Sequence, residues 1–423
     1  MNMTSLRWRN KSTLMLILCS VLLVACSRDR NSSTDVSASI RPGDSAPTRP
    51  VNPQLSASIR QFLQLYLQQI EQDQHEATSA LQQMDSAIYK LLDSPREDTL
   101  EQAREEWLNA YSLYELTTLH RYFIERIMPE ADKLQLMQLT YQINHWPILP
   151  GYLDSVTGYS DSGIVHDITV PLDGPSLRGQ HGVFELSEAS LGFHVLEFLL
   201  WGENLDKLSP RPFSDFTAIT QLNAEQREAG LEVVQLPSNR RRQMLALDSQ
   251  LLLEDFAASQ QLAQQQSAEF AADMSDIAPA RLLTLVIDTV NTMFTEELLV
   301  RSLYPMLNGD FVDSFQSPYS HSTQNAVSAQ LSSVERLLLE TGTEQGLSLD
   351  QILIELSPEF EQFFYQNFDT SKECLVLLYS TFEIPEAADV SRQAEFDIVE
   401  CINLLTNMID HLQQIKIQLL NPA

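Results

Sequence analysis

The chain has 423 residues and is strongly acidic, with 57 Asp and Glu residues against 27 Lys and Arg residues and a formal charge of −30. A surface of this charge repels polyanions, so nucleic acid and anionic lipid headgroups are excluded as expected partners. Only 13 glycines occur, alternating polar and apolar runs are few, and Leu, Gln, Glu and Ala are abundant, which predicts an all-α protein. About 370 folded residues exceed one usual helical bundle, so we expect two helical-bundle-like halves.

The N-terminus predicts a bacterial lipoprotein. Three basic residues precede a short apolar run, as in a secretory signal peptide, and the run is too short for a good membrane-spanning helix. Residues 23–26, Leu-Val-Ala-Cys, match the lipobox, so residues 1–25 are the predicted signal peptide and Cys26 is the predicted lipidation site. Because Ser27 follows, we expect a lipid anchor at the bacterial outer membrane, facing the periplasm. An ordinary signal peptide without an anchor is the alternative.

The rest of the chain divides into a tether and two helical parts. Residues 26–53 begin with the lipidated cysteine, are rich in Ser, Thr and Pro, and predict a disordered tether. Apolar residues then recur at helical spacing from Leu55 onward, with a long irregular connection at 146–180. We expect an N-terminal helical half at 54–235, which contains the motif described next, and a C-terminal helical bundle at 236–423.

The most informative segment is LGFHVLEFLLWGE, residues 191–203, within a helix predicted from about Phe184 to Trp201. His194 and Glu197 stand three residues apart, so a helix presents them on one face. Because the residues around them are apolar, the helix is predicted to be buried, and an ionised Glu197 then needs a partner. A metal ion is one such partner. The alternative is that Glu197 only accepts a hydrogen bond or pairs with an arginine, beside an ordinary core histidine.

Two cysteines, Cys374 and Cys401, remain in the folded part of the mature chain. They lie in predicted helices on either side of the breaker segment FEIPEAADVS, at nearly equal distances from its middle. In an antiparallel helical hairpin they would lie at a similar height, and the expected compartment is oxidising. A disulfide between them is one hypothesis, and two buried free thiols are the other.

Gly192, His194 and Glu197 form a GxHxxE pattern, and with this pattern the chain resembles the imelysin family. That family includes iron-regulated lipoproteins, a protein described as an insulin-cleaving metallopeptidase, and the periplasmic component of ferrous-iron uptake systems. The resemblance implies two bundle-like halves with the GxHxxE helix facing a cleft between them. It covers most of the mature chain, because further segments follow in the family's order: AREEWLNAYSLYEL at 103–116, WPILPGYLD at 146–154, RPFSDF at 211–216, NRRRQML at 239–245, EELLVRSL at 296–303 and SPYSHSTQNAV at 317–327.

The resemblance implies that His194 and Glu197 belong to a metal site. Two ligands hold a metal poorly, so further donors should converge from other helices. An imidazole with carboxylates suits iron or zinc, and the sequence does not choose between them. Tyr111 and Leu149 depart from the family's pattern and change the charge expected in the cleft. Five further candidate ligands lie in or beside the matched segments, each with a helix cap, a solvated charge or a structural ion pair as the alternative: Glu115, Asp154, Asp215, Glu297 and His321.

Three functions remain open from the sequence. The first is an imelysin-like envelope lipoprotein that binds a transition metal or its chelate, and iron is the metal we expect first. Such a protein would act in iron uptake together with an envelope transport partner. The second is a zinc metallopeptidase, in which zinc activates water. The chain contains no HExxH, the pattern that supplies two zinc ligands and a base, so this activity needs residues that the sequence does not identify. The third is a scaffold lipoprotein that holds no metal.

Overall fold

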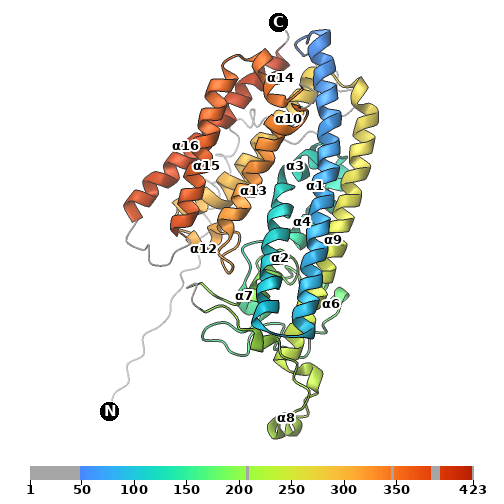
Figure 1. Cartoon of the computed structure of the whole chain (residues 1–423), viewed down its shortest axis with the longest axis vertical. Helices are drawn as coiled ribbons and strands as arrows, with labels where there is room; N and C mark the ends of the chain where they lie inside the picture. Colours follow the sequence, from blue (N-terminus) through green and yellow to red (C-terminus); the bar gives the residue numbers. More distant parts are fainter. Residues whose placement is uncertain (1–47, 206–208, 344–346, 383–390, 422–423) are drawn as a thin grey trace, which may run out of the picture. The chain divides into compact units, whose positions relative to one another are not determined.

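The structure is a computed structural model that describes residues 48–205, 209–343, 347–382 and 391–421 (Figure 1). The predicted signal peptide, Cys26 and most of the predicted tether lie outside these residues. The regular elements of the described part are helices, without a β-strand, which confirms the predicted all-α class. Among these helices, none has both the length and the apolar character needed to cross a membrane.

The described helices vary widely in length. Two of the segments, η4 and η5, are π-helices, and η1, η2 and η3 are short 3₁₀ turns. In chain order the elements are α1 (Pro53–Asp93), α2 (Glu97–Leu116), α3 (Thr118–Ile127), α4 (Glu130–Ile143), α5 (Pro150–Leu153), α6 (Gly174–Gln180), α7 (Phe193–Trp201), η1 (Phe213–Phe216), α8 (Ala224–Glu228), η2 (Val233–Gln235), α9 (Pro237–Asp273), η3 (Met274–Asp276), α10 (Pro279–Met293), η4 (Phe294–Leu303), α11 (Tyr304–Leu307), α12 (Phe311–Ser314), α13 (Thr323–Glu335), η5 (Arg336–Glu340), α14 (Leu349–Leu356), α15 (Phe360–Phe382) and α16 (Ser391–Leu420).

The long helices α1 and α9 form the frame on which the other helices pack. They have 41 and 37 residues and lie side by side, with α2 also packed against α1 (Figure 1). Local sequence explains where α1 begins: the Asn52 side chain accepts a hydrogen bond from the Leu55 backbone N–H at 2.7 Å, and Pro53 occupies the first turn. At 1.5 Å per residue, α1 spans about 60 Å, which is enough to contribute to more than one core.

Buried apolar side chains gather in two cores. The first joins the N-terminal part of α1 to α3, α10, α13, α15 and α16, together with the C-terminal part of α9. The second joins the rest of α1 to α2, α7 and the N-terminal part of α9. Both α1 and α9 contribute side chains to each core. The boundary expected at residue 235 stays a prediction.

A polar layer crosses α1 between the two cores. Its centre is a buried chain in which His120 Nε2 lies 2.8 Å from Asp73 Oδ2, and Tyr66 OH lies 3.0 Å from His120 Nδ1. Arg336 adds an ion pair to Asp73 at 3.0 Å. These contacts satisfy the buried carboxylate, so we interpret this histidine as structural and use it below as a control.

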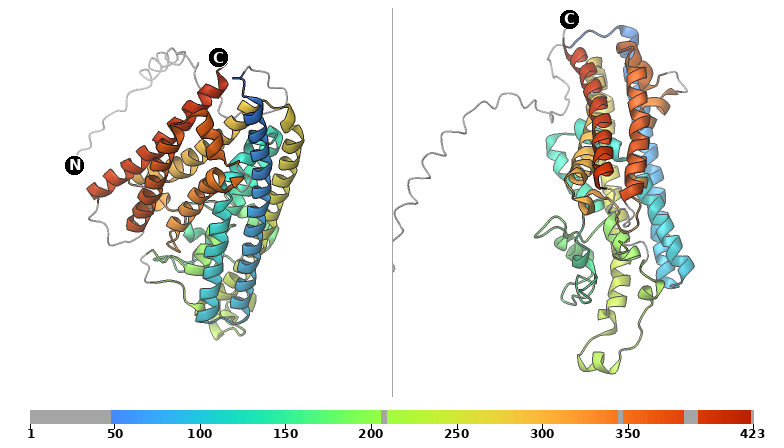
Figure 2. Two further views of the ribbon diagram at one scale, coloured as in Figure 1. Left: turned by 45° about the horizontal axis from the view of Figure 1, so that its top comes forward. Right: turned by 90° about the vertical axis from the view of Figure 1, so that its left-hand side faces the viewer.

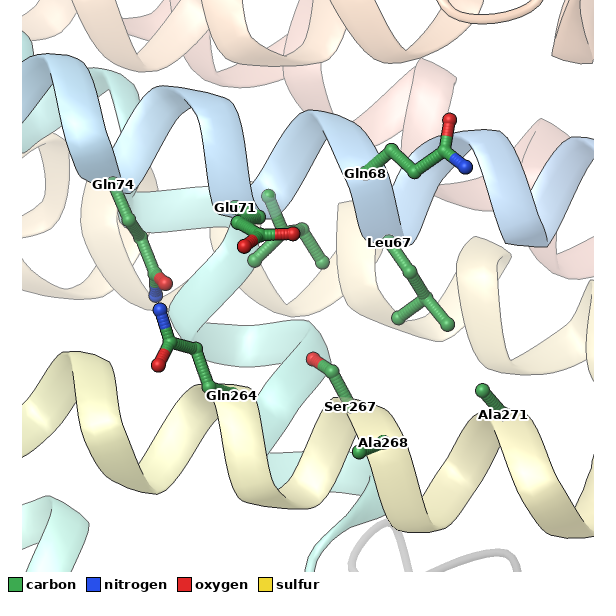
Figure 3. A pocket seen from close by; sticks show the side chains of 9 residues that line it. Leu67, Gln68, Glu71, Gln74, Gln264, Ser267, Ala268 and Ala271 are labelled. Carbon is green, nitrogen blue, oxygen red and sulfur yellow. The ribbon is translucent and has the colours of Figure 1, made fainter.

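A cavity of about 360 Å³ lies beside this layer, between α1 and α9. Figure 3 shows the side chains of Gln74 and Gln264 pointing toward each other across it. Gln74 Oε1 and Ser267 Oγ are buried without a hydrogen-bond partner among the described residues. The seam between the two long helices is therefore polar and incompletely filled at this height.

The C-terminal helices α15 and α16 pack against each other as a hairpin (Figure 2). The structure joins Cys374 and Cys401 across this pair, with an S–S distance of 1.95 Å and 5.7 Å between the Cα atoms. The sequence separation of the two cysteines is 27 residues. A disulfide that closes a loop of this length stabilises the fold by roughly 3–4 kcal/mol, because it lowers the conformational entropy of the unfolded chain.

We therefore predict that replacing both Cys374 and Cys401 by serine lowers the free energy of unfolding by roughly 3 kcal/mol. The bond itself is tested by alkylating the denatured, unreduced protein and measuring its mass. The expected result is that neither thiol reacts until a reductant is added. Reaction of both cysteines without reductant would show that they are free thiols.

Candidate functional site

The GxHxxE segment forms α7, and each of its nine residues is buried. The helix begins later than the pattern predicts: residues 184–191 form no helix, and Phe184 is 85% exposed. Gly192 sets the start of α7, because its φ of +101° lies outside the helical region and is a conformation that glycine adopts readily. A Cβ at this position would lie 2.5 Å from the carbonyl oxygens of Gln142 and Ile143. The expected start at Phe184 was wrong, and the glycine instead marks a close approach of two backbones at the start of α7.

Asp248 on α9 holds the first residue of the motif in place. Its Oδ1 accepts a hydrogen bond from the Gly192 backbone N–H at 2.9 Å, while its Oδ2 has no partner among the described residues. Burial raises the pKa of Asp248 well above the usual value, and the Gly192 hydrogen bond opposes this only in part. The folded protein therefore favours the neutral carboxylic acid at this position.

We predict that Asp248→Asn stabilises the fold at pH 7 by about 1 kcal/mol or more. A carboxyl whose pKa is raised by folding opposes folding at any pH above its unfolded pKa of about 3.9, and asparagine keeps the accepting oxygen without ionising. Denaturant unfolding at pH 7 and pH 4 checks this. The gain should shrink at pH 4, and a variant less stable than the wild type at pH 7 would show that the carboxylate is ionised and satisfied.

His194 and Glu197 contact each other within α7, as their spacing predicts. His194 Nδ1 lies 3.0 Å from Glu197 Oε2. The other oxygen, Oε1, accepts hydrogen bonds from the backbone N–H groups of Tyr319 and Ser320 at 3.0 and 2.8 Å and from the Ser320 hydroxyl at 2.7 Å. Glu197 is fully buried, so the segment before α13 supplies the donors that its carboxylate needs.

The second ring nitrogen of His194 faces α2 and the end of α4. Nε2 lies 2.9 Å from Asn144 Oδ1 and 3.2 Å from Tyr111 OH. The Asn144 amide donates in turn to Glu115 Oε1 at 2.7 Å, which orients its oxygen toward the imidazole. Glu115 is thus brought to the motif through Asn144, and Gln330 also donates to its carboxylate at 2.6 Å. We refer to Glu115, Asn144, His194, Glu197 and Tyr111 as the buried network.

The contact with Asn144 places a hydrogen on one nitrogen of the His194 ring. Because the Asn144 oxygen is an acceptor and faces Nε2, that nitrogen carries a hydrogen and donates it. Burial raises the pKa of Tyr111 well above its usual value, and the nearby charges of Glu115 and Glu197 add to this, so its hydroxyl stays protonated. A cation that binds Nε2 therefore has to displace a proton.

Asp154 lies in a separate buried ion cluster. Arg241 contacts its carboxylate through Nε at 2.5 Å and Nη2 at 3.0 Å, Arg211 approaches at 3.1 Å, and His166 Nε2 lies at 3.2 Å. Asp215 sits at the edge of this cluster, 3.4 Å from Arg211, with a partly exposed side chain. Both acids are therefore partners of arginines rather than of His194.

The last two candidate ligands also have other partners. Glu297 binds Arg121 at 2.6 Å and Arg301 at 3.1 Å, and His321 Nε2 lies 2.6 Å from the backbone oxygen of Asn204. Within the described ranges, no three His, Cys, Asp or Glu side chains gather closely enough to hold a metal ion. Of the five added candidates, the hydrogen-bond network brings Glu115 to the motif.

The motif borders a small cavity. Its volume is about 110 Å³, and its wall includes His194, Trp146, Gln316 and Tyr319. His194 itself is only 2% exposed. The side chain therefore lines a small cavity while remaining almost completely buried, and the α7 face that the resemblance places on a cleft is covered.

Sequence reasoning missed the groups that hold the pair in position. Asn144 stands two residues before the Trp-Pro segment, and Ser320 lies inside the SPYSHSTQNAV segment, so both were close to quoted motifs. Gln330 and Asp248 had no such signal, because an amide or an acid on a long helix is usually exposed to solvent. Their roles depend on the tertiary packing of α9 and α13.

These observations define an all-α protein whose second core encloses a pre-oriented His–Glu pair. The chain belongs to the imelysin family: the family model described as Imelysin (Peptidase_M75) matches residues 71–417. No curated protein matched the sequence. The fold is similar to the crystal structure of a protein from Parabacteroides distasonis provisionally described as an iron-regulated protein A precursor. That match has a TM-score of 0.60 and 14% sequence identity, and it covers 88% of this chain and 96% of that one. At this identity the likeness shows the fold.

Proposed function

We propose that this protein is an envelope lipoprotein that captures iron as cargo, anchored through Cys26 at the outer membrane and acting in iron uptake with an envelope transport partner. Membership of the imelysin family supports the proposal, as does the similarity to a protein described as iron-regulated. The charge of −30 adds to it, since a strongly acidic surface concentrates cations around the protein.

The observation that carries the proposal is the orientation of His194. Histidines that bind metals almost always donate the other ring N–H to a carboxylate, a carbonyl or water. Glu197 is such a partner, 3.0 Å from Nδ1, and it is held by three donors from the segment before α13. The arrangement leaves Nε2 as the ligand atom, with the oxygens of Asn144 and Tyr111 beside it. Because Nε2 carries a hydrogen, iron binding has to displace this hydrogen from Nε2.

A resident catalytic zinc fits the described residues poorly. A zinc peptidase needs three protein ligands, an open position and a general base. In the described part of the chain the motif supplies one imidazole and one carboxylate, and hydrogen-bond donors already surround the carboxylate. No observation favours hydrolysis, so we do not propose it. A scaffold that holds no metal is the alternative outcome of the experiment below.

The proposal is tested by titrating the protein from residue 27 to residue 423, which keeps every described residue, with Fe²⁺ and Zn²⁺. His194→Gln is compared with His120→Gln, a matched control because both histidines are 2% exposed and both contact a carboxylate. Circular dichroism and denaturant unfolding confirm that each variant is folded.

We expect stoichiometric iron binding by the wild type and by His120→Gln, and affinity at least tenfold lower in His194→Gln. Equal binding by all three proteins would move the site away from α7. Absence of binding by the folded wild type would favour the scaffold.

A further inference from the structure

A cavity of about 430 Å³ lies between α3, α4 and η4, and its lining includes Asn144, whose side chain contacts His194. Its inner wall carries Arg121, Tyr122 and Glu297, whereas Leu134 and Met137 line its mouth and are 68% and 63% exposed. Cavities of this volume that combine apolar walls with a few charged groups are typical of small-molecule sites. The function proposed above does not use this cavity.

The inner wall has an excess of positive charge. Arg121 and Arg301 both contact Glu297, so two guanidinium groups share one carboxylate. Burial alone would raise the pKa of Glu297, but the charges of Arg301 and Arg121 outweigh burial and lower it, so the carboxylate stays ionised. Lys133 and two exposed glutamates complete the charged lining, which as a whole carries three cations and three acids. The positive charge is confined to the inner wall, where the two guanidinium groups can bind the carboxylates of an anion.

The backbone of η4 places Glu297 and one of the two guanidinium groups at the cavity. Glu297 and Arg301 stand on η4, a π-helix of ten residues. Wide helical turns of this kind occur often at functional sites. The Arg301 guanidinium lies 4.3 Å from the centre of the Trp146 ring, which fixes its position beside the segment that leads to α7. The cationic wall and the motif helix are therefore connected through the residues around Asn144.

His145 supplies an imidazole to the same cavity. It lines the cavity and packs edge-on against Tyr141, with ring centres 4.5 Å apart. No hydrogen bond to another described residue occupies either ring nitrogen. One lone pair is thus available to a ligand.

We propose that this cavity binds a compact polycarboxylate chelate of the metal, with the ligand's carboxylates on Arg121 and Arg301 and the metal facing His145. The inference rests on the function proposed above and names the form in which the cargo arrives. The two guanidinium groups bind carboxylates and offer no ligand atom to a bare cation, whereas an anionic chelate places its carboxylates on them and needs only one protein ligand because its own oxygens fill the other positions.

Ferric citrate is the probe, beside citrate alone and Fe²⁺ alone, with the protein from residue 27 to residue 423. Calorimetry gives the affinity, and the fluorescence of Trp146 beneath Arg301 reports on the site. Arg301→Gln is compared with Arg178→Gln, because both side chains are 30% exposed and both pair with a buried carboxylate. Lys133→Gln is a second variant that leaves Glu297 and its two arginines intact.

We expect the wild type and Arg178→Gln to bind ferric citrate at least tenfold more tightly than citrate alone. Arg301→Gln should weaken the chelate at least tenfold and Lys133→Gln severalfold. Equal affinity of all four proteins, or equal affinity for citrate with and without iron, would overturn the proposal.

The arms of this experiment separate the two proposals. Fe²⁺ binding that His194→Gln abolishes, without any binding of ferric citrate, would leave the proposed function in place and overturn the chelate site. Ferric citrate binding that Arg301→Gln weakens, without binding of Fe²⁺ alone, would support the chelate site and remove the role of His194 as the iron ligand. Failure of both ligands would overturn both proposals.

Discussion

Replacing Gly192 by alanine is expected to destabilise the protein by about 4 kcal/mol or more. Gly192 has a φ of +101°, a conformation that side chains with a Cβ rarely adopt. The added Cβ would also lie 2.5 Å from two backbone carbonyl oxygens, at Gln142 and Ile143, which cannot move without shifting the end of α4. Denaturant unfolding followed by circular dichroism measures the loss.

Gly179→Ala is the control for this prediction. Gly179 lies in the helix α6, and a Cβ there would contact nothing within 4 Å. Alanine is the better helix former, so this variant should be as stable as the wild type or slightly more stable. A loss of less than about 1 kcal/mol for Gly192→Ala would contradict the close backbone approach that positions α7.

Asp154→Asn is expected to lower the free energy of unfolding by about 3–5 kcal/mol at pH 7, because it removes the carboxylate that the buried guanidinium groups of Arg211 and Arg241 share. Burial alone would raise the pKa of Asp154, but hydrogen bonds from His166 and Arg241 and the charges of both arginines outweigh burial and lower it. A carboxyl with a lowered pKa stabilises the fold above its unfolded pKa of about 3.9, and this contribution is lost as pH falls through the lower folded pKa.

The difference in stability between the wild type and Asp154→Asn should therefore be complete at pH 7 and shrink below about pH 4. Asp215→Asn is the matched control, since Asp215 contacts the same Arg211 at 3.4 Å but its side chain is 38% exposed. The ion pair between Arg211 and Asp215 is expected to contribute less than about 1 kcal/mol to the free energy of unfolding. Equal losses from the two variants would show that the Asp154 cluster is not the buried anchor that its contacts indicate.

The sequence predicted the fold class because helical periodicity and scarce glycine are local properties. It also predicted that His194 and Glu197 share a face and are buried, since both follow from three-residue spacing in an apolar run. It misplaced the start of the motif helix at Phe184. The conformation of Gly192, which makes the helix begin at Phe193, depends on the backbone of α4, which lies about 50 residues earlier in the chain.

The remaining candidate ligands could not be placed from the sequence. Asp154, Asp215 and Glu297 are acids in or beside motif segments, and only the tertiary structure shows that each of them faces arginines. The partners of the buried network come from α2, α4 and the segment before α13, so no local pattern relates them to α7. An amide such as Asn144 also carries no charge that would single it out in the sequence.

Iron bound by the imidazole of His194 should show nitrogen from this ring in its ligand shell. X-ray absorption at the iron edge measures that shell in the iron-loaded wild type, in His194→Gln and in His120→Gln. We expect imidazole nitrogen in the wild type and in His120→Gln, and its loss in His194→Gln. A shell of oxygen atoms alone, or an imidazole signal unchanged in His194→Gln, would show that His194 does not bind the iron.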